Sequence, residues 1–99
     1  MKTFMHELTR IKKIRKMRKD LQYSKRLRSN ERICQIKEDM LDSYMSSQNK
    51  FKFYIDISSE VDKDVIYHLA KKYEFFIVEE KYLQATKTTR FYFKESKSH

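Results

Sequence analysis

The sequence predicts an α+β fold with two N-terminal helices followed by a β-α-β-β unit that contains a three-stranded mixed sheet. Apolar residues recur at steps of three and four in the first half of the chain, which is helical spacing. In the second half they alternate with polar residues, as in strands. With 99 residues, 39% of them hydrophobic, the chain can build one modest core. We therefore expect a single domain overall, with a basic helix and link at residues 1–28 and a helix plus β-α-β-β core at residues 29–99.

The first helix is expected from Thr3 to about Gln22. Cations surround its apolar stripe, which consists of Phe4, Leu8, Ile11, Ile14, Met17 and Leu21. The periodicity lapses between residues 23 and 28, which predicts a short basic link. Because the chain contains neither Gly nor Pro to mark a break, the sequence also allows this link to be helical, joining the first two helices into one long kinked helix.

The second helix is expected to begin at Glu31, because Ser29 or Asn30 is a good N-cap. A polar run at residues 46–49 ends it. Its apolar stripe consists of Ile33, Ile36, Met40, Leu41, Tyr44 and Met45. This spacing predicts an amphipathic helix with one buried face.

A strand is expected over residues 51–57, where apolar and more polar residues alternate. A third helix should follow, with Ser58 or Ser59 as its cap. Acidic residues stand near its N-terminus, and Lys71 and Lys72 lie in its last turn. Charges in these places complement the helix dipole, which supports the prediction.

The segment Phe75–Val78 is a continuous apolar run, which predicts a central strand covered on both faces. Residues 88–94 alternate again and should return as its antiparallel hairpin partner, after a loop at residues 81–87. The helical connection predicts that the first two strands lie parallel, with a right-handed crossover.

Positive charge is concentrated at the N-terminus. Residues 1–28 contain eleven Lys or Arg against two acidic residues, whereas residues 29–99 contain twelve of each sign, so the first segment carries the whole net charge of +9. This asymmetry is typical of proteins that bind a polyanion. Our leading hypothesis is a small non-enzymatic protein that binds nucleic acid, DNA or RNA, and acts as a regulator or accessory factor.

The candidate phosphate-binding residues lie on the first helix and the link. They are Arg10, Lys12, Lys13, Arg15, Lys16, Arg18, Lys19, Lys25, Arg26 and Arg28. The sixteen Lys outnumber the seven Arg, which favours phosphate contact over bidentate base recognition and predicts modest sequence specificity. Arg15 and Arg18 are the best candidates for contacting bases.

A secondary site is expected on the sheet. Lys52, Tyr54, Arg90, Tyr92 and Lys94 would share one face if the flanking strands align. Aromatic rings interleaved with cations form a stacking platform for single-stranded RNA or DNA. The competing interpretation packs the rings of Tyr54 and Tyr92 beneath the N-terminal helices.

Several other classes of protein are disfavoured. The absence of glycine excludes phosphate-binding glycine loops and the nucleophile elbow. His6, Cys34 and His68 stand in different predicted elements, so we expect no metal, cofactor or catalytic residue. A single cysteine fits a reducing cytoplasm, and no apolar run is long enough to span a membrane.

Other partners stay open at this point. The chief alternative is a protein-binding inhibitor or adaptor, of the kind found in viruses and mobile elements, that docks on an acidic partner surface. The first helix could instead lie on an anionic membrane surface. A homodimer is also expected, because Phe4, Leu8 and Ile11 need a partner surface.

Overall fold

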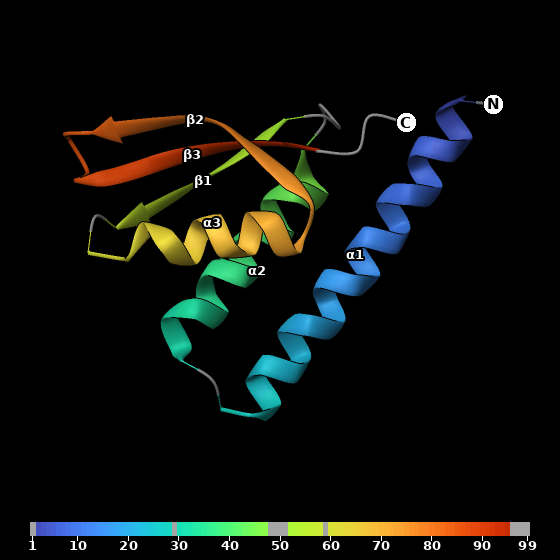
Figure 1. Ribbon diagram of the computed structural model, residues 1–99, viewed down its shortest axis with the longest axis horizontal. Helices are drawn as coiled ribbons and strands as arrows, with labels where there is room; N and C mark the ends of the chain where they lie inside the picture. Colours follow the sequence, from blue (N-terminus) through green and yellow to red (C-terminus); the bar gives the residue numbers. More distant parts are fainter. Residues whose placement is uncertain (1, 29, 48–51, 59, 96–99) are drawn as a thin grey trace. The chain divides into compact units, whose positions relative to one another are not determined.

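The computed structural model describes residues 2–28, 30–47, 52–58 and 60–95, with side chains described from residue 8 onward. The elements follow the order α1 (Lys2–Arg26), α2 (Glu31–Ser46), β1 (Phe53–Ser58), α3 (Lys63–Lys72), β2 (Phe75–Leu83) and β3 (Thr88–Glu95) (Figure 1). The α+β class and the β-α-β-β order after two helices are confirmed.

The chain forms two compact units, Met1–Leu41 and Asp42–His99. The boundary falls within α2, whereas the sequence predicts the division between the basic segment and the core after residue 28. The last turn of α2 therefore belongs to the second unit, together with the sheet and α3. A single domain overall stays a prediction.

A turn separates α1 from α2, so the two helices are not one kinked helix. The backbone N–H of Leu27 donates to the carbonyl of Tyr23 at 3.0 Å, and Arg28 then adopts a left-handed conformation with a φ of 55°. The side chain of Asn30 accepts from the backbone N–H groups of Arg32 at 2.8 Å and Ile33 at 3.3 Å. Asn30 is thus the N-cap of α2, as predicted, while Ser29 lies outside the described residues.

The apolar stripe predicted for α1 is buried only in part. Met17 and Leu21 are buried, and Ser24 extends the same face by one turn. Leu8 and Ile11 are exposed, Ile11 by 48%, although the pattern placed them on the buried stripe. The side chain of Phe4 lies outside the described part.

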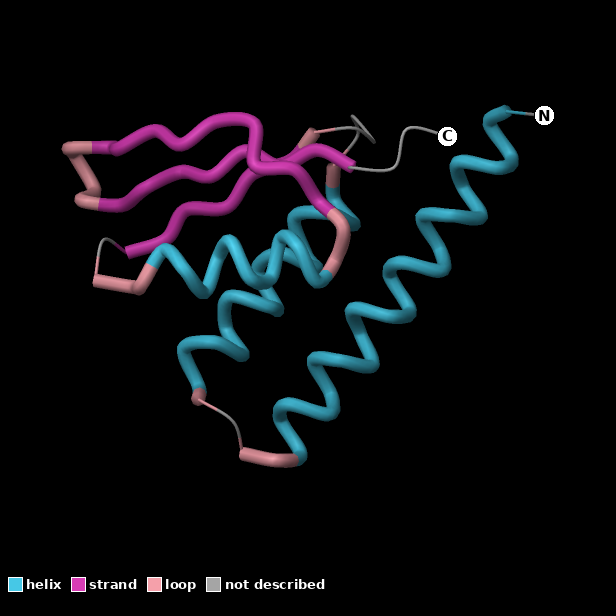
Figure 2. Tube along the Cα trace, viewed as in Figure 1, coloured by secondary structure: helices cyan, strands magenta, loops and turns pink. Residues whose placement is uncertain are grey.

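The sheet has the strand order β1-β3-β2, and both neighbouring pairs are antiparallel. Two expectations are therefore wrong: the sheet is antiparallel rather than mixed, and β3 rather than the Phe75–Val78 strand is central. β1 and β2 do run in the same direction, because both oppose β3, but they do not pair with each other. The α3 connection leaves one strand position between them, and the hairpin strand β3 occupies it (Figure 2).

β2 is an edge strand. Of its apolar start only Phe75 is buried, while Phe76 is 57% exposed and Val78 47% exposed. The register against β3 shifts between Ile77 and Glu79, so a bulge inserts Val78 without a partner. The strand continues to Leu83, which shortens the predicted loop to residues 84–87.

The N-cap of α3 is Asp62, not Ser58 or Ser59 as predicted. Its carboxylate accepts from the backbone N–H of Asp64 at 2.9 Å. The hydroxyl of Ser58 instead accepts from the N–H of Glu60 at 3.3 Å, in the turn before the helix. Ser59 lies outside the described residues. The carboxylate of Asp62 lies closer to the first turn, where it can accept from a backbone N–H group. Its negative charge also interacts favourably with the positive N-terminal end of the helix dipole.

The core of the second unit is an aromatic cluster between α3, the last turn of α2 and one face of the sheet. The ring centroids of Phe53 and Phe75 are 4.9 Å apart in an edge-to-face arrangement, and those of Phe53 and Phe93 are 5.1 Å apart and stacked. Tyr44 joins Phe75 at 5.3 Å. Ring pairs of this kind contribute about 0.5–1.5 kcal/mol each beyond their burial. α3 covers this face of the sheet (Figure 1), which leaves the side chains of the opposite face for other contacts.

Candidate nucleic-acid interface

The outward face of α1 is a line of exposed cations. Lys12, Arg15, Lys19 and Arg26 follow one another at steps of three, four and seven residues, which places them on one side of the helix. Lys16 lies beside them and is also exposed. None of these five side chains makes an ion pair with any residue that the structure describes. We call this set, Lys12, Arg15, Lys16, Lys19 and Arg26, the α1 cation surface.

Asp20 does not neutralise the α1 cation surface, although it is the one acidic residue between positions 8 and 28. Its carboxylate lies 3.1 Å from the ammonium of Lys37 on α2, and both side chains are largely buried. The same ammonium donates to the hydroxyl of Ser24 at 2.6 Å. Lys37 therefore neutralises the charge of Asp20 between the two helices. The solvent side of α1 carries cations without carboxylates from residue 8 onward.

Not every predicted cation belongs to this surface. Lys13 is only 9% exposed, because it stands four residues before Met17 on the buried stripe. Lys25 lies 4.0 Å from Glu38, and Arg10 is half-buried. Arg18 is exposed on the flank of the surface and has other contacts of its own, while Arg28 is exposed in the turn after the helix.

The dimensions suit a phosphate backbone. From Lys12 to Arg26 the helix rises by about 21 Å at 1.5 Å per residue. Duplex DNA presents one negative charge per roughly 1.7 Å of its axis, so phosphates outnumber the cations along such a length. Each member of the α1 cation surface can then meet a phosphate without competing with its neighbours.

The five residues of the predicted secondary site do lie together on one face of the sheet. The strand register places Tyr54 opposite Tyr92, with ring centroids 5.6 Å apart. The ammonium of Lys52 lies 5.2 Å from the centre of the Tyr92 ring. Tyr54 is 46% exposed, whereas Tyr92 is half-buried. The interpretation that packs both rings beneath the N-terminal helices stays a prediction.

Part of this face is already engaged. Arg90 donates to both carboxylate oxygens of Asp56, at 2.7 and 3.1 Å, and its guanidinium lies 4.2 Å from the centre of the Tyr54 ring. The hydrogen bond to Asp56 is the main cause that raises the pKa of Arg90. Asp56 is not among the residues that the sequence predicts for this site, and it joins the site because the antiparallel pairing places it directly opposite Arg90.

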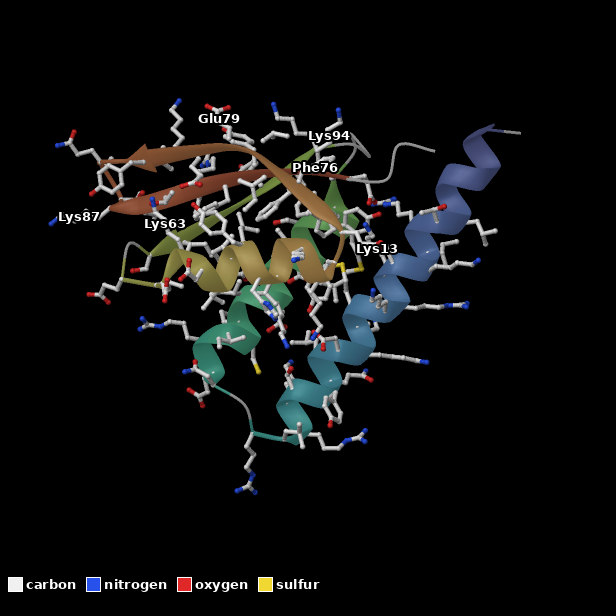
Figure 3. All side chains as sticks on the ribbon, in the orientation of Figure 1. Lys13, Lys63, Phe76, Glu79, Lys87 and Lys94 are labelled. Carbon is white, nitrogen blue, oxygen red and sulfur yellow. The ribbon has the colours of Figure 1, made fainter. Side chains whose placement is uncertain are left out.

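The other end of the sheet face is more open. Lys94 and Glu79 point away from α3 (Figure 3), and the exposed ring of Phe76 stands opposite Lys94 in the register. The sequence predicts that Phe76 lies on a strand covered on both faces, whereas the register places its ring beside Lys94, on the face that points away from α3. This end offers Lys94, Lys52 and two aromatic rings, those of Phe76 and Tyr92.

The cysteine and histidine side chains that the structure describes lie on different helices. Cys34 is buried in α2, and His68 is exposed on α3. In the part of the chain that the structure describes, no three His, Cys, Asp or Glu side chains are grouped in a way that could hold a metal ion. Across the same residues, no helix is both long and apolar enough to cross a membrane.

Comparison of the chain with protein-family models, with curated proteins and with solved structures finds no match. The case for a function therefore depends on the geometry and charge described above.

Proposed function

We propose that this protein binds nucleic acid without catalysing a reaction, through phosphate contacts made by the α1 cation surface. The observation that carries the proposal is the ion pair between Asp20 and Lys37. Because its carboxylate is paired with Lys37 at 3.1 Å, the exposed side of α1 has no carboxylate of its own between residues 8 and 26 to compete with phosphates.

The charge distribution supports the same conclusion. The net charge of +9 comes from the first 28 residues, whereas a cation needed only for solubility could stand anywhere on the surface. The single cysteine, Cys34, is buried as a thiol, and we place the protein in a reducing cytoplasm, as an accessory or regulatory factor.

The test is a charge reversal on α1. Replacing Lys12, Arg15 and Lys19 by Glu should abolish most of the binding to labelled duplex DNA, single-stranded DNA and RNA in fluorescence anisotropy. The slope of log affinity against log salt should become shallower by about three, because three phosphate contacts are lost. All three side chains are exposed, so circular dichroism should report an unchanged fold.

A matched variant controls for total charge. Arg32, Lys71 and Lys87 are exposed cations outside α1, and their replacement by Glu changes the net charge by the same amount. This variant should keep the affinity within a few fold. Equal weakening by both variants would show that overall charge, and not α1, attracts the polymer. Absence of binding by the native chain to all three polymers would sink the proposal and favour an acidic protein partner.

The sheet face supports a secondary contact in the same function. Its open end combines Phe76 and Tyr92 with two lysines, which is the composition of a stacking platform for unpaired bases. Phe76→Ala should weaken the binding of single-stranded oligonucleotides by several fold and leave duplex binding unchanged, because duplex bases are already stacked. Equal effects on both polymers would remove the sheet face from the proposal.

A further inference from the structure

The outer edge of β2 combines unpaired backbone with exposed apolar side chains. In the strand order β1-β3-β2, and within the part of the chain that the structure describes, it pairs on one side only. Phe76, Val78 and Tyr82 are 57%, 47% and 55% exposed. An edge strand of nine residues with this composition is a template for pairing with another strand.

A groove runs beside this edge. It lies between α3 and β2, has a volume of about 500 Å³, and is lined in part by Tyr67, Ala70 and Phe76. Side chains of an added strand would have room there. The edge therefore offers main-chain hydrogen bonds and an adjoining apolar recess.

We propose that β2 pairs with β2 of a second copy of this chain, antiparallel, so that the two sheets join across a twofold axis. A twofold axis perpendicular to the sheet requires one residue to stand opposite its own copy, because hydrogen-bonded and non-hydrogen-bonded pairs alternate along antiparallel strands. The register is thus limited to centres at single residues of β2.

Opposite charges and exposed apolar side chains together favour a centre at Glu80. With Glu80 at the axis, Glu79 stands opposite Lys81 of the copy, and this pair occurs twice. Val78 then stands opposite Tyr82, which joins two exposed apolar side chains. A centre at Glu79 or at Lys81 would instead place a like-charged pair on the exposed face.

The Glu80 carboxylates at the axis are each held within their own subunit. The hydroxyl of Tyr67 donates to one oxygen at 2.5 Å, and the ammonium of Lys63 lies 3.3 Å from the other. Both partners draw the carboxylate toward α3 and offset its charge. The repulsion between the two copies is reduced accordingly.

The exposed apolar residues of α1 are less suited to self-association. Leu8 and Ile11 stand next to Lys12 and Arg15 on the same exposed side of the helix, so two copies that met there would bring like charges together. β2 has the opposite property, because its Glu79 and Lys81 complement those of a second copy.

The experiment is sedimentation equilibrium of the full chain at 150 mM salt, where charges more than about 8 Å apart are largely screened. The native chain should form a dimer at concentrations of about 10–500 μM, as expected for a modest strand interface. Glu79→Lys and Lys81→Glu should each weaken the dimer about tenfold or more, because each substitution creates two like-charged pairs.

Mixing the two variants decides the register. In a mixed dimer, the lysines at positions 79 and 81 of one chain face glutamates of the other, so the equimolar mixture should dimerise about as well as the native chain. Glu60→Lys, at an exposed position outside β2, makes the same charge change as Glu79→Lys and should leave the dimer intact. A monomeric native chain at 500 μM, or a mixture that stays as weakly associated as the single variants, would overturn the proposal.

Discussion

Among the residues that the structure describes, three adopt a left-handed backbone conformation without being glycine: Arg28, Glu74 and Lys87, with φ values of 55°, 61° and 55°. Each occupies a chain reversal, at the ends of α1 and α3 and in the β2–β3 hairpin. The conformation costs a residue with a Cβ roughly 1–2 kcal/mol. Because the sequence contains no glycine, the native fold carries this cost at three turns.

Lys87→Gly should therefore stabilise the protein. Relief of the left-handed conformation outweighs the larger entropy of glycine in the unfolded chain, which is about 0.4–1 kcal/mol, and leaves a net gain of about 0.5–1 kcal/mol. Urea unfolding followed by circular dichroism measures the change. Ala85→Gly in the same loop, where φ is not positive, should lose stability by about 0.5–1 kcal/mol. Equal losses for both variants would contradict the explanation.

Glu80 and Tyr67 couple the stability of the second unit to pH. The hydrogen bond from the Tyr67 hydroxyl is the main cause that lowers the pKa of Glu80 from its ordinary value of 4.5, with Lys63 assisting. The same hydrogen bond is the main cause that raises the pKa of Tyr67 above 10.0. Stability from Glu80 is complete above pH 4.5 and is lost as the pH falls through its lowered pKa. Stability from Tyr67 is complete below pH 10.0 and is lost as the pH rises through its raised pKa.

Tyr67→Phe should flatten the pH dependence at both ends. The variant removes the shared hydrogen bond, so its melting temperature should fall less than that of the native chain when the pH drops below 4.5 or rises above 10. The readout is the melting temperature across this pH range. Parallel profiles for the two proteins would show that the pair contributes nothing.

At the scale of the elements, the contact between α1 and α2 contains a largely buried polar cluster. The ammonium of Lys37 in α2 forms an ion pair with Asp20 of α1 and donates a hydrogen bond to the hydroxyl of Ser24 in the same helix. Removing the carboxylate leaves a buried ammonium with one neutral partner, which is more costly than removing a pair at the surface. The cluster thus gives the pairing of the two helices a defined register.

Asp20→Asn should destabilise the protein by about 1–3 kcal/mol, below the range for a fully buried pair because both side chains keep some exposure. Urea unfolding measures this loss of stability. The thiol of Cys34, which is buried in α2, should also be labelled faster in the variant than in the native chain. The control is Glu38→Gln, which breaks the exposed pair with Lys25 and should cost less than about 0.5 kcal/mol. Similar losses for the two variants would refute a special role of the buried cluster.

At the scale of the whole molecule, the net charge of +9 predicts that the affinity for nucleic acid falls steeply as the salt concentration rises. If the five cations of the α1 cation surface meet five phosphates of a duplex, log affinity should fall with log salt with a slope of about −4.5. Raising the salt from about 50 to 200 mM would then weaken binding roughly 500-fold, and a single strand roughly 100-fold. A titration by anisotropy measures both slopes. A slope near zero would mean that the contacts are not phosphate contacts.

Much of the fold could be predicted because it depends on local patterns. The period of the apolar residues located the three helices and three strands that the structure describes, and Asn30 was identified as an N-cap from its residue type. The cap of α3 was misplaced because Ser58, Ser59 and Asp62 are all of residue types that cap helices well, and only the backbone geometry distinguishes them.

The candidate site was predicted in outline for the same reason. A run of cations on a helix is visible in the sequence, and five of the ten predicted residues form the α1 cation surface. The burial of Lys13 could have been anticipated from its spacing to Met17. The pairing of Asp20 with Lys37 could not, because seventeen positions separate the two residues and neither forms part of a recognisable motif.

The sequence by itself determined the secondary structure and the charge asymmetry, since both depend on residues near one another in the chain. Only the tertiary structure decided the strand order β1-β3-β2, which moved Phe75–Val78 from the expected centre of the sheet to its edge. Strand order depends on which distant segments pair, and an apolar run such as Phe75–Val78 is compatible with burial on two faces or with exposure on an edge. The accessibility of Phe76 and the engagement of Arg90 by Asp56 follow from that pairing.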